Sequence, residues 1–279
     1  MVSVAYLSGG QDVWYTSAGE GAPIVLLPGL GFSGYYWKRQ WALADRYQVI
    51  TLDPRGQGHS GASLGPWTLS QVATDVRALI LELDLREVTL VGWSMTSFVL
   101  FEYVRRYGND RIKALCSVDM TPRNTLDPQW PHAIFGDLTM GKVVNVGGSI
   151  IDDQKAWFYG LSAACFAAGA TVDEQLVADW TAEGLRTSTG ALLAYWLDLA
   201  RSDWREFVRT ITVPTLLCHG TRSQAVPTDV GAWLRDAMPN ATLTRFEHSG
   251  HVPFWEEAEA FNTHLDAFLT SVPVTPVMR

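Results

Sequence analysis

The chain has 279 residues, of which 47% are hydrophobic and 18% are charged, a composition typical of a folded globular protein rather than a disordered one. Its 21 basic and 29 acidic residues give a net charge of −8, which disfavours nucleic acids and anionic membranes as partners. Three scattered cysteines form no metal-binding or disulfide pattern. We expect neither a secretory leader nor a membrane span, and therefore a soluble, cytoplasmic protein.

Short apolar runs alternate with longer amphipathic segments, which is typical of a parallel sheet covered by helices. The apolar runs predict strands at residues 24–27, 49–52, 88–91, 114–118, 213–218 and 241–246. Helical periodicity predicts helices at about residues 69–83, between Ser94 and Gly108, and near residues 230–237 and 258–268. The first of these helices should begin at a capping box formed by Thr68 and Gln71.

The alternation of strands and helices stops between residues 121 and 209. Helical periodicity and five tryptophans replace convincing strand patterns there. We therefore predict a core formed by residues 1–120 and 210–279, interrupted by a helical cap at residues 121–209.

Ser94 lies at a junction between a strand and a helix, within Gly92-Trp93-Ser94-Met95-Thr96. A serine on such a sharp turn projects above the sheet, and the N–H groups that follow it can bind an oxyanion. The ordinary alternative for a serine at this place is a helix N-cap.

Two further loops follow predicted strands. His251 comes after the last strand, and Ser249-Gly250 before it permits a close backbone approach, so we prefer His251 to His248 as the functional histidine. The loop Pro28–Phe32 follows the first core strand, and an N–H group there, with that of Met95, can form an oxyanion hole. A simple turn is the alternative for this loop.

These motifs resemble the α/β-hydrolase superfamily over nearly the whole chain. The resemblance rests on four segments in the family's order: Leu27-Pro28-Gly29, Asp53–Ser60, Gly92–Met95 and Ser249–Phe254. It implies a mostly parallel eight-stranded sheet with helices on both faces and a helical cap. It also implies a nucleophilic serine, a histidine base, a carboxylate, and an oxyanion hole made by the N–H groups of Leu30 and Met95. We expect no cofactor and no metal.

The sequence departs from the family pattern at two places. The G-x-S-x-G motif ends in Thr96, whose branched side chain should crowd the helix against the neighbouring strand and slightly repack the turn. The loop after the next-to-last strand, which often carries the acid, has Ser223 and no carboxylate. Asp119, at the end of the strand after the serine helix, resembles the acid of haloperoxidase-like esterases, and we assign it that role. Helix capping is its alternative role, and Asp229 is the rival acid.

We therefore predict a Ser94–His251–Asp119 triad that cleaves an ester, lactone or related acyl bond of a hydrophobic small molecule through an acyl-enzyme. The candidate substrate contacts are all aromatic: Phe32, Trp93, Trp157, Trp180 and Trp196. Packing within the cap, or under the sheet edge for Trp93, is the ordinary alternative.

Two other functions stay open. One is a cofactor-independent dioxygenase acting on a hydroxy-heteroaromatic, quinolone-like substrate with a His–Asp dyad, because members of the fold with that activity resemble this chain in the place of the aspartate. The other is a ligand receptor without catalysis on the same scaffold.

Overall fold

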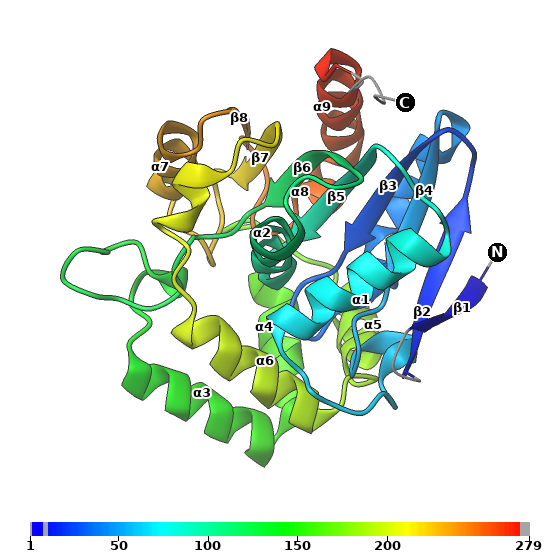
Figure 1. The fold of residues 1–279 in the computed structure, drawn as a ribbon. Helices are drawn as coiled ribbons and strands as arrows, with labels where there is room; N and C mark the ends of the chain where they lie inside the picture. The colour runs from blue at the N-terminus through cyan, green and yellow to red at the C-terminus, as the bar shows by residue number, and fades with distance from the viewer. Residues whose placement is uncertain (1, 8–10, 274–279) are drawn as a thin grey trace.

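The computed structural model describes residues 2–7 and 11–273, which form an eight-stranded sheet in the order β1-β2-β4-β3-β5-β6-β7-β8 (Figure 1). The strands are β1 Val2–Leu7, β2 Gln11–Ala18, β3 Ala22–Leu27, β4 Tyr47–Leu52, β5 Val88–Trp93, β6 Ile112–Val118, β7 Thr215–Gly220 and β8 Ala241–Phe246. Strands β3 to β8 run parallel, while β2 is antiparallel to both of its neighbours. The predicted mostly parallel eight-stranded sheet is confirmed.

The sequence predicted six of these strands and missed β1 and β2. Both lie at the antiparallel edge of the sheet (Figure 1). Polar residues leave β2 an apolar run of only three residues, whereas β1 has a run of four, Val4–Leu7, that was not assigned to a strand.

Helices cover both faces of the sheet. The helices of the core segments are α1 Leu69–Glu82, α2 Met95–Tyr107, α7 Asp229–Ala237, α8 Pro253–Glu256 and α9 Ala258–Ser271, with 3-10 segments η1 Gly34–Asp45 and η2 Gly58–Ser60. The Thr68 side chain accepts a hydrogen bond from the N–H of Gln71, so the predicted N-cap of α1 is confirmed, whereas the Gln71 side chain donates to Asp75 and completes no capping box in the described chain. Gly108 ends α2 with a positive φ of 63°, as its position predicted.

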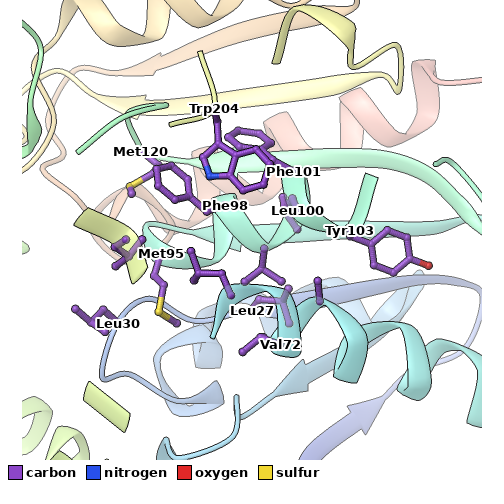
Figure 2. Close-up of a cluster of buried hydrophobic side chains, with 14 of the residues drawn as sticks. Leu27, Leu30, Val72, Met95, Phe98, Leu100, Phe101, Tyr103, Met120 and Trp204 are labelled. Atoms are coloured by element: carbon purple, nitrogen blue, oxygen red, sulfur yellow. The ribbon is translucent and has the colours of Figure 1, made fainter. Parts of the chain in front are cut away.

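Alternate residues of the central strands face two separate hydrophobic clusters. Val25 and Leu27 of β3 pack with α1 and α2, whereas Ile24 and Leu26 pack on the other face with η1 and α9. Figure 2 shows the first cluster, in which side chains of α2 lie close to Leu27. This two-sided burial explains why the central strands are continuous apolar runs.

Between β6 and β7 the described chain forms four further helices and no strand longer than an isolated bridge. They are α3 Met140–Asp152, α4 Gln154–Ala164, α5 Glu174–Gly184 and α6 Thr189–Arg201, accompanied by η3 Ile134–Gly136 and η4 Phe207–Thr210. Figure 1 shows these helices gathered below the sheet. We call residues 121–209 the cap segment; its independence from the core stays a prediction. In the described part of the chain, every helix is too short or too polar to cross a lipid bilayer.

Candidate active site

Ser94 sits on a strained turn between β5 and α2. Its φ and ψ are 54° and −120°, in a region that residues with a side chain rarely adopt, and its N–H donates to the carbonyl of Val118 at 2.9 Å. A side chain on Gly29 would place its Cβ 3.3 Å from that of Ser94, so the loop after β3 passes directly against the turn. The Ser94 side chain makes no capping hydrogen bond to α2, which argues against the N-cap alternative.

Thr96 fits into this turn through its hydroxyl group. The side chain is fully buried, and its Oγ1 lies 2.8 Å from the carbonyl oxygen of Leu27 and 3.0 Å from that of Trp93. The threonine thus adds a hydrogen bond between the start of α2 and the end of β3, where the family pattern has only a glycine. The turn keeps its sharp form despite the additional Cβ.

Asp119 and His251 form a buried pair. Asp119 follows β6 with a φ of 46°, is completely buried, and places Oδ2 2.6 Å from Nδ1 of His251. The same carboxylate accepts hydrogen bonds from the hydroxyl of Ser223 at 2.6 Å and the N–H of Gly220 at 3.2 Å. These hydrogen bonds compensate for the burial of the carboxylate. Asp229 lies exposed at the start of α7 and has no such contact.

The backbone around His251 is held on both sides. Its N–H donates to the carbonyl of Cys165 in the cap segment at 2.7 Å, and its carbonyl accepts from Nε1 of Trp93 at 2.9 Å. A Cβ on Gly250 would lie 2.5 Å from the backbone of Phe166, so the close approach expected from Ser249-Gly250 is present. His248, in contrast, is exposed.

A second histidine, which the sequence did not single out, lies beside this pair. His219, at the end of β7, is buried and has its Nδ1 3.5 Å from Oδ1 of Asp119. Burial lowers the pKa of His219, although the charge of Asp119 opposes that shift. The neutral imidazole therefore packs against the carboxylate.

Gln57 fixes the loop after β3. Its Oε1 accepts a hydrogen bond from the N–H of Gly31 at 2.8 Å, and its Nε2 donates to the carbonyls of Gly29 at 3.1 Å and Phe32 at 2.8 Å. The N–H groups of Leu30 and Met95 take no part in these three hydrogen bonds. Gln57 belongs to the Asp53–Ser60 motif, so that motif identified a structural turn but not the contact it makes with this loop.

A cavity of about 350 Å³ lies above Ser94 and is shared by the core and the cap segment. Ser94, Asn124, Cys165 and His251 are the lining residues that bear polar or thiol side chains. The other lining residues are apolar: Leu30, Phe32, Met120, Ile134, Phe135, Val146, Ala156, Trp157, Gly160, Leu161, Ala164, Trp196, Leu199 and Ala225. Among the described lining residues there is no Asp, Glu, Lys or Arg.

Three of the five aromatic residues that we expected to contact substrate line this cavity: Phe32, Trp157 and Trp196. Trp93 and Trp180 are both fully buried and are not among the residues that line the cavity, so a substrate contact by either stays a prediction. The Trp93 ring stacks on Phe32 with centroids 4.8 Å apart, under the sheet edge, and Trp180 packs against Tyr36 in the second hydrophobic cluster.

Within residues 2–7 and 11–273, no group of three His, Cys, Asp or Glu side chains is arranged to hold a metal ion.

Comparison with known proteins places the chain among enzymes. The family model described as "alpha/beta hydrolase fold" matches residues 22–258. A non-heme chloroperoxidase from Streptomyces lividans is 28% identical, with 95% of this chain and 98% of the relative covered. A bifunctional esterase/perhydrolase from Acinetobacter calcoaceticus is 27% identical, with 94% and 97% covered.

The structural comparison agrees with the sequence comparison. The crystal structure of a bromoperoxidase from Bacillus anthracis superposes with a TM-score of 0.87 at 28% identity, covering 96% of this chain and 100% of that one. The strand order, the strained serine turn and these matches lead to one conclusion: the chain belongs to the α/β-hydrolase fold family, in its haloperoxidase-like branch.

Proposed function

We propose that the protein is a serine hydrolase that cleaves an ester, lactone or related acyl bond of a hydrophobic small molecule. One observation carries this proposal: the strained Ser94 and the Asp119–His251 pair meet at the same apolar cavity, since Ser94 and His251 both line it. The esterase activity named for the Acinetobacter relative agrees with the proposal.

The chemistry follows from the hydrogen bonds. Asp119 binds Nδ1 of His251, which favours the tautomer whose Nε2 is free to act as base. In the proposed reaction Nε2 accepts the hydroxyl proton of Ser94 while Oγ attacks the substrate carbonyl. The N–H groups of Leu30 and Met95 would bind the oxyanion that forms.

Release of the alcohol and hydrolysis of the acyl-enzyme complete the reaction. The protonated His251 gives its proton to the leaving alcohol, which departs and leaves an ester on Ser94. His251 then takes a proton from water, whose oxygen attacks the acyl carbonyl, and returns that proton to Ser94 as the acid is released. Hydrogen peroxide in place of water would release a peracid from the same acyl-enzyme.

The lining of the cavity supports an uncharged, largely apolar substrate. A volume of about 350 Å³ is at the small end of the range for ligand sites. An ionised acyl chain would lose its hydration there without gaining a counter-charge, because no Lys or Arg is among the described lining residues.

Covalent labelling tests the proposal. We expect a fluorophosphonate probe to modify Ser94 and p-nitrophenyl esters of short apolar acids to be hydrolysed. Ser94→Ala should abolish labelling and lower kcat by about 10⁴-fold or more while leaving Tm unchanged. Ser149→Ala is the control, because Ser149 is exposed on α3 and does not line the cavity, so the variant should keep both the labelling and the kcat of the wild type.

Two other results would contradict the proposal and favour a different function. Oxygen uptake with a hydroxyquinolone that survives Ser94→Ala would indicate the dioxygenase alternative. Tight binding of an apolar ligand without labelling or turnover would indicate a receptor.

A further inference from the structure

Asn124 is the polar side chain of the cavity that has no place in the proposed reaction. It follows β6 by a few residues, in the cap segment, and lines the same cavity as Ser94 and His251. It is 1% exposed, and within the described residues neither Oδ1 nor Nδ2 of its carboxamide has a hydrogen-bond partner. A buried carboxamide in this condition has lost its hydration without replacing it.

The polar groups next to Asn124 in the chain, in contrast, have hydrogen-bond partners. The carbonyl of Arg123 accepts from Thr121 and from Nε1 of Trp130, both at 2.9 Å, and the Arg123 guanidinium pairs with Asp203 at 2.6 Å. The backbone carbonyl of Asn124 itself accepts from the N–H of Ile134 at 3.0 Å. The main chain is thus fixed by hydrogen bonds while the Asn124 side chain is left unsatisfied.

The place of Asn124 also separates it from the other buried polar atoms without a partner. Those in the described chain belong to Trp37, Gln40, Ser162, Trp180, Trp204 and His219, and none of these residues lines the cavity. Among the described residues with such atoms, only Asn124 lines the cavity, and both the donor and the acceptor of its carboxamide lack a partner.

We propose that Asn124 is a specificity-determining residue that binds one uncharged polar group of the substrate, a hydroxyl or an amide, inside an otherwise apolar cavity. A hydroxyl can donate to Oδ1 while accepting from Nδ2, and an amide can do the same with its N–H and carbonyl. This inference rests on the proposed function, because it describes the acyl part of the same substrate.

A position scan tests the inference. The probes are p-nitrophenyl esters of one acyl length, either unsubstituted or carrying a hydroxyl on each carbon in turn. We expect one hydroxylated ester to have a kcat/KM above that of the unsubstituted ester by about 10- to 100-fold in the wild type. Asn124→Leu, which has a similar volume, should remove this preference and raise kcat/KM for the unsubstituted ester.

Ser162→Ala is the matched control. Ser162 has a buried, unpartnered hydroxyl in α4 but does not line the cavity, so its loss should leave the preference unchanged. Asn124→Leu should also raise Tm by roughly 2–4 °C, since it removes an unsatisfied polar group. An unchanged preference in Asn124→Leu, no preference at any carbon in the wild type, or a lower Tm would overturn the inference.

A second measurement separates this inference from the proposed function. If the wild type hydrolyses none of the esters, the proposed function fails, and the corresponding ketones are then titrated against tryptophan fluorescence, because Trp157 and Trp196 line the cavity. Tighter binding of one hydroxylated ketone, lost in Asn124→Leu, would support the role of Asn124. Equal affinities in the two proteins would overturn it.

Discussion

The rim of the sheet and the opposing wall of the cavity are built from different interactions. By the rim we mean Ser94, Asp119, His251 and the loop Pro28–Phe32; by the wall we mean the lining residues contributed by the cap segment. At the rim, Asp119 accepts from three groups and Gln57 makes three hydrogen bonds to the loop. The wall is apolar apart from Asn124 and the thiol of Cys165.

The reacting groups at the rim must be placed accurately, whereas the side chains of the wall must only fill space. Hydrogen bonds at the rim set the direction of each reacting group, and small displacements there carry large losses in rate. The wall acts through volume and polarity, for which similar apolar side chains can substitute. Substitutions at the rim should therefore affect kcat, and substitutions in the wall should affect the choice of substrate.

After the loss of Ser94, the largest effect is expected at the acid. Asp119→Asn should lower kcat for p-nitrophenyl esters by about 10³- to 10⁴-fold, because the amide cannot stabilise the protonated His251 or hold its tautomer. Asp229→Asn, on the exposed start of α7, should change kcat by less than about 2-fold. The opposite ranking would refute the assignment of Asp119.

Ser223 sharpens this test, because it stands where many relatives of the fold keep the acid and already contacts Asp119 Oδ2 at 2.6 Å. Ser223→Asp alone should impair the enzyme, since two carboxylates would share one site. Combined with Asp119→Asn, it should recover about 10-fold or more of the lost kcat by supplying a carboxylate from the neighbouring loop. A double variant no better than Asp119→Asn would show that this loop cannot replace the acid.

The sequence predicted the rim better than the wall, and the reason is physical. Turns such as the one at Ser94 need particular residues at fixed spacings, so Gly92-Trp93-Ser94 and Ser249-Gly250-His251 are recognisable in a single chain. Asp119 was assigned on other grounds: the loop after the next-to-last strand has no carboxylate, and the place of Asp119 resembles that of the acid in haloperoxidase-like esterases.

The wall depends on packing between distant helices, which spacing does not encode. Trp157 and Trp180 look alike as aromatic residues on helices, yet one lines the cavity and the other is buried in the second hydrophobic cluster. The contacts of Gln57 and His219, and the place of Asn124 in the cavity lining, were missed because they depend on segments far apart in the chain. Asn124 lies in the polar stretch Thr121–Thr125, so the sequence offers no signal that singles it out.

Gln57 allows the rim to be disturbed without touching a reacting group. Gln57→Leu should lower kcat by about 10- to 100-fold with little change in KM, because the loop that carries the Leu30 N–H loses three hydrogen bonds. The rate of fluorophosphonate labelling should fall in parallel. Gln40→Leu is the control, since Gln40 is also buried but bonds to the carbonyl of Phe254, away from the loop.

A substitution in the wall should change the preferred substrate. Trp157→Ala enlarges the cavity and should move the preferred p-nitrophenyl ester to a longer acyl chain, with kcat/KM for the original optimum falling by about 10-fold or less. Tyr159→Ala is the control, because Tyr159 lies exposed on the same helix and does not line the cavity. An unchanged acyl preference in Trp157→Ala would mean that the acyl chain binds elsewhere.

The smallest effect concerns stability and pH, and it belongs to His219, which lies beside Asp119 of the rim. Burial lowers the pKa of His219 below its ordinary value of 6.5, so the folded protein favours the neutral imidazole. The resulting stabilisation is complete above the unfolded pKa and is lost as the pH falls from about 6.5 toward the folded pKa. The free energy of unfolding should therefore drop by up to about 1.4 kcal/mol per pH unit in that window.

Urea unfolding at several pH values between 7 and 5 measures this dependence. His219→Phe should flatten the profile because it removes the titrating ring, whereas His248→Gln should keep it, since His248 is exposed. If the wild type and His219→Phe lose stability with the same slope, the acid sensitivity of the fold arises elsewhere. A flattened profile would show that the buried imidazole beside the rim makes the fold sensitive to acid.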